Sequence, residues 1–194
     1  MDLPDTHSHN PHLAIHLDRA NNMCEGSEII VHNYKSPCGI LLLGSIDDKL
    51  CLCDWQVEKH HDKVVQRIHR ATDKRFITGI TSVISQSINE LDEYFSGIRK
   101  EFSIPLKFIG SEFQKQVWKE LLNVPYGTTV SYREIARSIF KPTAIRAVAN
   151  ANGANALSIF VPCHRIIGSD NSLTGYGGGL HIKKFLLDLE KSHH

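Results

Sequence analysis

The 194-residue sequence lacks any run of 18 apolar residues, the length that usually identifies a membrane-spanning helix. The first 27 residues contain no apolar core flanked by basic residues, so the pattern of a secretory signal is missing too. With 41% hydrophobic and 22% charged residues, the composition is typical of a soluble globular protein. We expect an intracellular protein, cytoplasmic if bacterial and nuclear if eukaryotic, with no membrane partner.

Cysteine is scarce and irregularly spaced. The five cysteines are at positions 24, 38, 51, 53 and 163, an odd number that fits no disulfide framework. The C-x-x-C pair of many structural zinc sites is absent as well. Cys51 and Cys53 are two residues apart, so on a regular strand they would share one face, and we interpret them as buried free thiols. We therefore expect a reducing compartment, no metal and no cofactor.

Net charge is also small, at +1, but it is unevenly distributed. Residues 1–109 carry 12 basic and 15 acidic side chains, whereas residues 110–194 carry 10 basic and 6 acidic ones. A basic carboxy-terminal half is compatible with a polyanionic partner such as nucleic acid, although this excess alone does not identify one.

The amino-terminal half has the pattern of a small α/β domain. Residues 1–27 show no clear periodicity, and we interpret them as a flexible extension. Apolar runs separated by turn residues predict three strands, at Glu28–Tyr34, Gly39–Leu43 and Leu50–Trp55. Helical spacing follows at Val57–Arg70 and Ile80–Phe95, and an extended segment at Phe102–Phe108.

The second half predicts mainly helices. Ser111 and Gln114 form a capping box at the start of a helix whose predicted inner face is Phe113, Val117, Trp118, Leu121 and Leu122. Tyr132–Phe140 and Thr143–Asn152 predict two short helices joined by a tight turn, a helix-turn-helix candidate. The last helix, Leu180–Glu190, has a predicted apolar face of Ile182, Phe185, Leu186 and Leu189.

The fold class is therefore α/β. We expect a small amino-terminal α/β domain (residues 28–108) with an antiparallel sheet of three or more strands. A mostly helical domain with a helix-turn-helix (residues 109–194) would follow it.

The segment IFVPCHRIIGSD, residues 159–170, contains the strongest candidate for catalysis. A thiol reacts as its thiolate, and a neighbouring imidazole or guanidinium favours that form, as His164 and Arg165 could for Cys163. An ordinary buried cysteine beside two polar residues is the alternative. We expect the sulfur to be ionised at the mouth of a cleft.

The helix pair is the candidate DNA-binding element. Between Thr128 and Asn155 there are four basic residues and one acidic residue, and the second helix, TAIRAVANAN, is rich in alanine. Such a helix can approach a narrow groove closely while Arg146 projects, as in minor-groove binders. A small-residue helix packed against its neighbours is the alternative.

These segments together resemble the O6-alkylguanine-DNA alkyltransferase family, most closely the bacterial methylated-DNA–protein-cysteine methyltransferases. The resemblance is densest from Ser111 to Glu190 and weaker over residues 28–108. It rests on these segments: Tyr126-Gly127, Val130-Ser131-Tyr132, Arg146-Ala147-Val148, Asn155, Val161–Ile167, Thr174-Gly175-Tyr176, Leu186–Glu190, and, in the first half, Ser36-Pro37 and Gly39. Residue 177 is glycine, where some relatives have a larger or polar residue, so the tolerance of bulky alkyl groups stays open.

The resemblance implies a role for each matching residue. Cys163 would accept the alkyl group, His164 would act as its base through a water, and Glu190 would orient His164. Asn155 would hold the active-site turn, and Tyr132 would protonate the leaving guanine. The alkyl pocket would be lined by Tyr176, Gly177, Gly178, Val161 and Pro162. The DNA-binding residues would be Arg146, Tyr132, Ser131, Thr143, Ala144, Ala147 and Arg165, with Arg146 filling the gap left by a flipped nucleotide.

The implied activity is that of a methylated-DNA–protein-cysteine S-methyltransferase acting as a monomer on double-stranded DNA with alkylated guanine. It would bind the minor groove, flip the base out and react once per molecule, since no residue offers a route to regenerate the thioether. O4-alkylthymine stays open as a further substrate. Two rival functions are a cysteine hydrolase with a Cys-His-Glu triad and a DNA-binding regulator, and a benzylguanine probe would label only the transferase.

Overall fold

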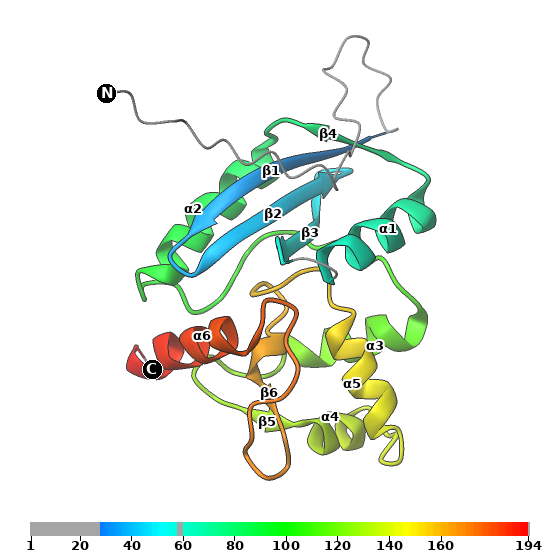
Figure 1. Cartoon of the computed structure of the whole chain (residues 1–194), viewed down its shortest axis with the longest axis vertical. Helices are drawn as coiled ribbons and strands as arrows, with labels where there is room; N and C mark the ends of the chain where they lie inside the picture. The colour runs from blue at the N-terminus through cyan, green and yellow to red at the C-terminus, as the bar shows by residue number, and fades with distance from the viewer. Residues whose placement is uncertain (1–27, 58–59, 194) are drawn as a thin grey trace, which may run out of the picture.

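A computed structural model describes residues 28–57 and 60–193 of the chain. The predicted extension, residues 1–27, lies outside the described residues. Figure 1 shows a four-stranded sheet with two helices above a mostly helical second half. This arrangement confirms the expected fold class.

The sheet is built on two hairpins and one added strand. The strands β1 (Glu28–Ser36), β2 (Gly39–Ile46) and β3 (Lys49–Trp55) are antiparallel neighbours, as predicted. The β2–β3 turn has Asp47 and Asp48 at φ 49° and 53°, the left-handed pair that tight hairpins require. The sequence did not predict β4 (Arg75–Thr78), which pairs with β1 in parallel and makes the sheet mixed, in the order β3-β2-β1-β4.

Strand β3 contains a β-bulge that changes which face its residues occupy. Gly44 of β2 pairs with Leu52, and the next residue, Ser45, pairs with Leu50, so Cys51 is the extra residue. Cys51 consequently packs in one hydrophobic cluster and Cys53 in the other. The prediction that these two cysteines share one face is therefore wrong, because the bulge interrupts the alternation of the strand.

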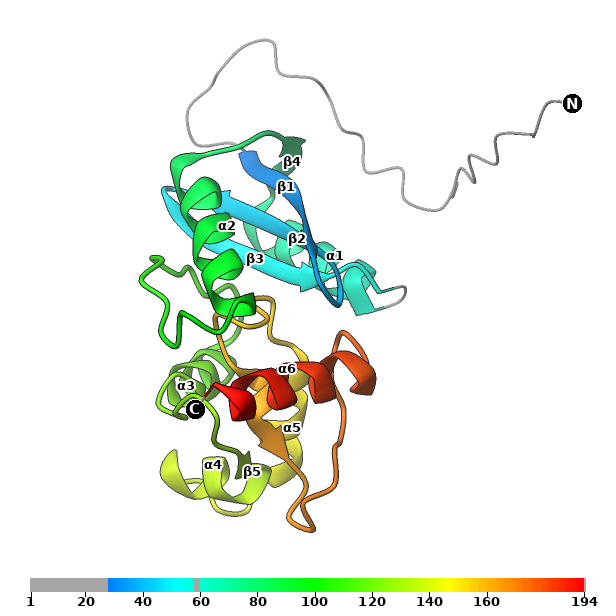
Figure 2. The ribbon, with the colours of Figure 1, turned by 90° about the vertical axis from the view of Figure 1, so that its left-hand side faces the viewer.

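Two helices cover opposite faces of the sheet (Figure 2). The first, α1 (His60–Thr72), buries Val64 and Ile68 against one face. The second, α2 (Ser82–Phe95), packs on the other, and its N-cap residue Thr81 accepts a hydrogen bond from the amide of Ile84.

The second half begins with α3 (Glu112–Leu121), whose predicted capping box at Ser111 and Gln114 is present. It continues through β5 (Val130–Ser131), α4 (Tyr132–Ser138), α5 (Ile145–Gly153), the 3₁₀ turn η1 (Cys163–Arg165), β6 (Ile166–Ile167) and α6 (Leu180–Ser192). The predicted helix-turn-helix is α4–α5, and β5 and β6 form a two-stranded parallel pair. Among residues 28–57 and 60–193, no helix is long and apolar enough to cross a membrane.

Two apolar faces predicted from helical spacing each contain an error. Leu122 is 45% exposed because α3 ends at Leu121 and Leu122 is the C-cap, where the periodicity no longer applies. Phe185 is 39% exposed on α6, whereas Ile182 and Leu186 are buried. The predicted extended segment 102–108 forms only a bridge between Leu106 and Leu50.

The edge of β3 joins the two halves of the chain. The amide of Cys53 donates to the carbonyl of Ala156 (2.8 Å), and the amide of Ser158 donates to the carbonyl of Cys53 (2.7 Å). One hydrophobic cluster contains residues of β3, α2, α3 and α5 together, including Trp55, Tyr94, Trp118 and Val148. The segment that leads to Cys163 is therefore anchored on the amino-terminal sheet.

Candidate active site

Cys163 begins the η1 turn and is almost completely buried, with 4% exposure. The side-chain amide of Asn155 donates to its Sγ at 3.1 Å and to the carbonyl of Val161 at 3.0 Å. The Oδ1 atom of Asn155 accepts from the amide of Leu157, so this one side chain fixes both ends of the loop before Cys163. Asn155 therefore contacts the thiol and both ends of this loop.

The charge state of Cys163 differs from the expectation. Burial raises the pKa of the thiol to about 11, against the opposing effects of the Asn155 hydrogen bond and the charge of Lys183. The expectation of an ionised sulfur at the mouth of a cleft is therefore wrong for the protein without DNA. The thiol is neutral, and its deprotonation requires a base.

His164 and Glu190 form the fully buried pair next to Cys163. The imidazole Nε2 and the Oε1 atom of Glu190 are 2.7 Å apart. Burial lowers the pKa of His164, outweighing the effect of Glu190, so the ring is neutral. Since a carboxylate only accepts, Nε2 carries the proton, and Nδ1 is left as an acceptor with no hydrogen-bond partner among the described residues.

Glu190 is ionised although it is buried. Burial raises its pKa, but the hydrogen bonds and charges of His164 and Arg165 outweigh that effect and hold it well below its usual range. Its oxygens also accept from the hydroxyl of Tyr94 (2.9 Å) and the amide of Gly127 (3.0 Å). The carboxylate thus connects α6, η1 and α2.

Arg165 does not lie where a DNA-binding role requires it. It is 6% exposed, its guanidinium pairs with Glu190 through Nε (2.9 Å) and Nη2 (3.0 Å), and its Nη1 donates to the carbonyl of Val124 (2.6 Å). The prediction that Arg165 binds DNA is wrong because this arginine neutralises a buried carboxylate instead.

Lys183 is a site residue that the sequence analysis missed. It is fully buried on α6, and its ammonium donates to the carbonyls of Ile166 and Thr174, the second at 2.6 Å. Burial lowers its pKa to about 8, and its charge favours the thiolate of Cys163. Lys183 is the fourth residue of α6, and nothing in its neighbouring sequence distinguishes it from a lysine on the surface of a helix.

The predicted pocket residues gather around the loop before α6. Val161, Pro162 and Gly178 are buried, and Tyr176 and Gly177 are partly buried. The indole Nε1 of Trp55 donates to the hydroxyl of Tyr176 at 2.9 Å, so the amino-terminal sheet contacts this loop directly. The sequence analysis did not associate Trp55 with the site.

The helix pair presents small and basic residues to the solvent. Thr143, Arg146 and Ala147 are exposed, and Ala144 is partly exposed. Ser131 caps α4 in a capping box with Glu134, and Tyr132 accepts a 3.4 Å hydrogen bond from the hydroxyl of Thr174. Figures 1 and 2 place the α4–α5 turn and the first part of the β6–α6 connection at the same end of the molecule, away from the four-stranded sheet, and the connection then runs back toward α6.

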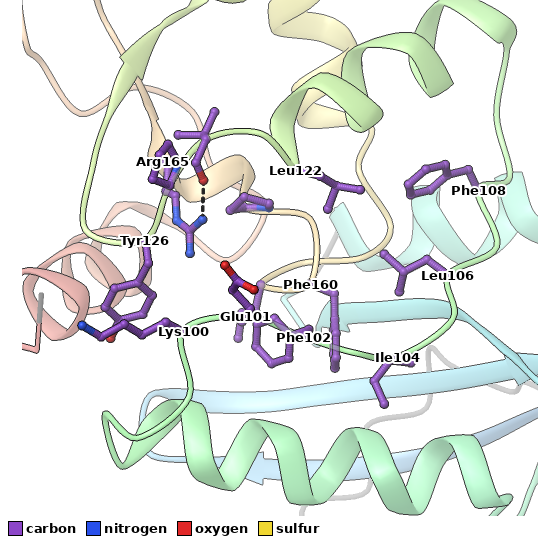
Figure 3. A pocket seen from close by; sticks show the side chains of 14 residues that line it. Lys100, Glu101, Phe102, Ile104, Leu106, Phe108, Leu122, Tyr126, Phe160 and Arg165 are labelled. Atoms are coloured by element: carbon purple, nitrogen blue, oxygen red, sulfur yellow. Dashed lines mark hydrogen bonds between the residues drawn. The ribbon is translucent and has the colours of Figure 1, made fainter.

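A cleft of about 760 Å³ lies near the site but does not contain the sulfur (Figure 3). Its walls are the segment after α2, with Lys100, Glu101 and Phe102, and the turn with Pro162 and Arg165. Cys163 is not among its lining residues, so we do not assign the alkyl group to it.

Two family models match the chain. Residues 29–108 match the ribonuclease-like domain of 6-O-methylguanine DNA methyltransferase, and residues 112–192 match its DNA-binding domain. Over 163 residues the chain is 39% identical to a constitutive methylated-DNA–protein-cysteine methyltransferase of Bacillus subtilis, covering 81% of this chain and 92% of that protein.

A second curated relative and a solved structure show the same similarity. A methylated-DNA–protein-cysteine methyltransferase of Mycobacterium bovis is 53% identical over 108 residues, which are 56% of this chain and 66% of that protein, just under two thirds. The crystal structure of Mycobacterium tuberculosis OGT in complex with DNA superposes with a TM-score of 0.74 at 40% identity, covering 84% of this chain and 94% of that one.

Proposed function

Because the chain belongs to the methylated-DNA–protein-cysteine methyltransferase family, we propose that it repairs DNA by transferring the alkyl group of O6-alkylguanine to Cys163. The observation that carries the proposal is the buried array in which Asn155 holds the Cys163 thiol beside the His164–Glu190 pair. A nucleophile, a neighbouring base and a group that orients the base are the components of covalent catalysis.

DNA binding would use the exposed face of the helix pair. An alkyl group on guanine O6 lies inside the base stack, so the nucleotide must leave the duplex at a cost of a few kcal/mol. Arg146, exposed on α5, would enter the minor groove and occupy the position of the extruded nucleotide. The alkyl group would lie among Tyr176, Gly177, Gly178, Val161 and Pro162.

The transfer is a single displacement at carbon. The free Nδ1 of His164 takes the thiol proton through a water molecule, and the thiolate attacks the alkyl carbon while the carbon–oxygen bond to guanine breaks. Tyr132 donates a proton to the departing guanine, so that both products are neutral. The ammonium of Lys183 favours the thiolate as it forms. The thioether has no route back to a thiol, so each molecule reacts once.

The experiment is intact-protein mass spectrometry after mixing with duplex DNA that contains O6-methylguanine. We expect one methyl group per protein, on the peptide with Cys163, in a stoichiometric burst. Cys163→Ala should gain no mass. Turnover beyond one equivalent, or methylation elsewhere, would contradict the proposal.

A benzylguanine base probes the rival functions. Covalent labelling of Cys163 supports the transferase, because neither a cysteine hydrolase nor a DNA-binding regulator would retain the benzyl group. We further propose that the protein acts as a monomer in a reducing compartment, where the acceptor thiol persists. Reaction with O4-methylthymine DNA in the same assay decides whether that lesion is a second substrate.

A further inference from the structure

The loop before α6 contains four glycines in residues 175–179, and they are there for different reasons. Gly179 has φ 89°, the left-handed conformation that favours glycine. Gly177 has no positive φ, so its backbone would accept alanine. A neighbour limits the space instead: a Cβ at Gly177 would lie 2.4 Å from Nε2 and 2.8 Å from Cδ2 of His60, so a side chain there would force the imidazole to move.

His60 is the first residue of α1 in the amino-terminal domain. Its imidazole therefore crosses from one half of the chain to cover the backbone of a loop in the other half. Trp55 makes the contacts on either side, because its indole donates to Tyr176 and occupies the space where a Cβ of Gly178 would lie. Trp55 and His60 thus lie against three consecutive loop residues, Tyr176, Gly177 and Gly178.

A buried carboxylate orients His60. Asp54 is fully buried at the end of β3; its Oδ1 lies 3.6 Å from Nε2 of His60, and its Oδ2 lies 3.2 Å from Nδ1 of His61. Oδ1 has no hydrogen bond among the described residues, and the His60 imidazole lies just beyond hydrogen-bond distance of it. A buried carboxylate needs polar partners, so Asp54 places both histidines at the start of α1 within its reach.

We propose that His60 is a positioning residue of the alkyl transfer. Beside Asp54, its imidazole occupies the space next to the Gly177 backbone and keeps the Tyr176–Gly178 segment where it would line the alkyl pocket. This inference rests on the proposed function. It gives the amino-terminal domain a direct part in the reaction and offers a reason for the glycine at residue 177.

The test is a double-mutant cycle on the single-turnover rate constant for O6-methylguanine in duplex DNA. Gly177→Ala alone creates the clash and should slow transfer about tenfold or more, since a displacement of about 1 Å at an active site can cost a hundredfold. His60→Ala alone frees the loop and should slow transfer about tenfold. In the double variant the new methyl group fills the space of the imidazole, so we expect a rate within about threefold of wild type.

Two further measurements separate positioning from loss of structure. The dissociation constant for the same duplex, measured in a Cys163→Ala background, should stay within about twofold of its value without the loop substitutions. His69→Ala, an exposed histidine on the same helix, should react at the wild-type rate. If His60→Ala does not fold, His60→Asn serves in the same cycle.

A double variant no faster than Gly177→Ala, or a His60→Ala variant that reacts like wild type, would overturn the inference. Those results leave the proposed function intact, because the wild-type protein still transfers its methyl group. Absence of transfer by the wild-type protein would instead reject the proposed function, and the inference with it.

Discussion

At the scale of single residues, burial controls the charge of Cys163. The sulfur is 4% exposed, and its pKa of about 11 leaves little thiolate near neutral pH. A neutral thiol is less exposed to oxidants and chance electrophiles than a thiolate. The proposed transfer would therefore depend on the neighbouring imidazole as a base.

This charge state predicts a pH dependence. In the protein without DNA, iodoacetamide should modify Cys163 slowly at neutral pH and about tenfold faster for each pH unit up to about 10. The raised pKa also stabilises the fold below about pH 8.5, and this contribution is lost as pH rises toward the folded-state value. Peptide mass spectrometry follows the modification at each pH. Rapid, pH-independent modification near pH 7 would show that the resting sulfur is ionised.

A second residue-scale feature is the strained Phe140 at the turn of the helix pair. It has φ 59° and is 92% exposed, so no burial offsets the left-handed conformation. Phe140→Gly should raise the free energy of unfolding by about 1 kcal/mol, measured by urea denaturation. Ile98→Gly, at an exposed position without positive φ, is the control and should bring no gain.

At the scale of elements, the helix pair and the thiol would contribute to separate steps of the proposed reaction, DNA binding and alkyl transfer. Arg146→Ala removes the side chain that would hold the duplex open and leaves the buried array untouched. We expect transfer from duplex DNA to fall about tenfold or more, and labelling by free benzylguanine to stay within about twofold. Lys119→Ala, an exposed basic residue on α3, is the control. Equal losses on both substrates would exclude an extrusion role for Arg146.

Local sequence patterns predicted most helices and strands. They did not predict the features that depend on pairing with residues far away in the chain. The predicted capping box at Ser111 and Gln114, for example, involves residues three apart in the chain. Strand β4 has only four residues and owes its existence to pairing with β1, far earlier in the chain. The bulge at Cys51 likewise depends on the register with β2, which the sequence of β3 alone does not contain.

The site was predictable where a motif is contiguous and not where contacts cross the fold. Cys163 and His164 are adjacent in sequence, and the family resemblance implied roles for Asn155 and Glu190, whose side chains contact those of Cys163 and His164. Lys183 and His60 acquire their significance only from tertiary contacts, with the carbonyls around β6 and with Gly177. Arg165 was misassigned because a basic residue beside a nucleophile has the same sequence pattern whether it faces DNA or a buried carboxylate.

At the scale of the whole molecule, Glu190 connects the two halves. It lies on α6, accepts from Tyr94 of the amino-terminal domain, and neutralises Arg165. Removal of its charge would leave a buried guanidinium without compensation, which typically costs about 3–5 kcal/mol. The proposed catalytic pair and the contact between the two halves therefore share one carboxylate.

Glu190→Gln should accordingly lower the free energy of unfolding by about 3–5 kcal/mol, measured by urea denaturation at pH 7. The lowered pKa of Glu190 contributes stability above about pH 4.3 that is lost as pH falls further, so the variant should show a weaker acid dependence than wild type. Glu112→Gln, an exposed carboxylate paired with Lys115, should show no measurable loss.

The extra residue in β3 makes the strand intolerant of a change in length. Because Cys51 is inserted opposite β2, every later position is shifted by one, and this shift turns Trp55 toward the loop of Tyr176. Deletion of that single codon would leave composition and hydropathy almost unchanged. It would nevertheless turn the end of the strand over. The Trp55 indole would then leave the loop of Tyr176, and the Asp54 carboxylate would leave the two histidines at the start of α1.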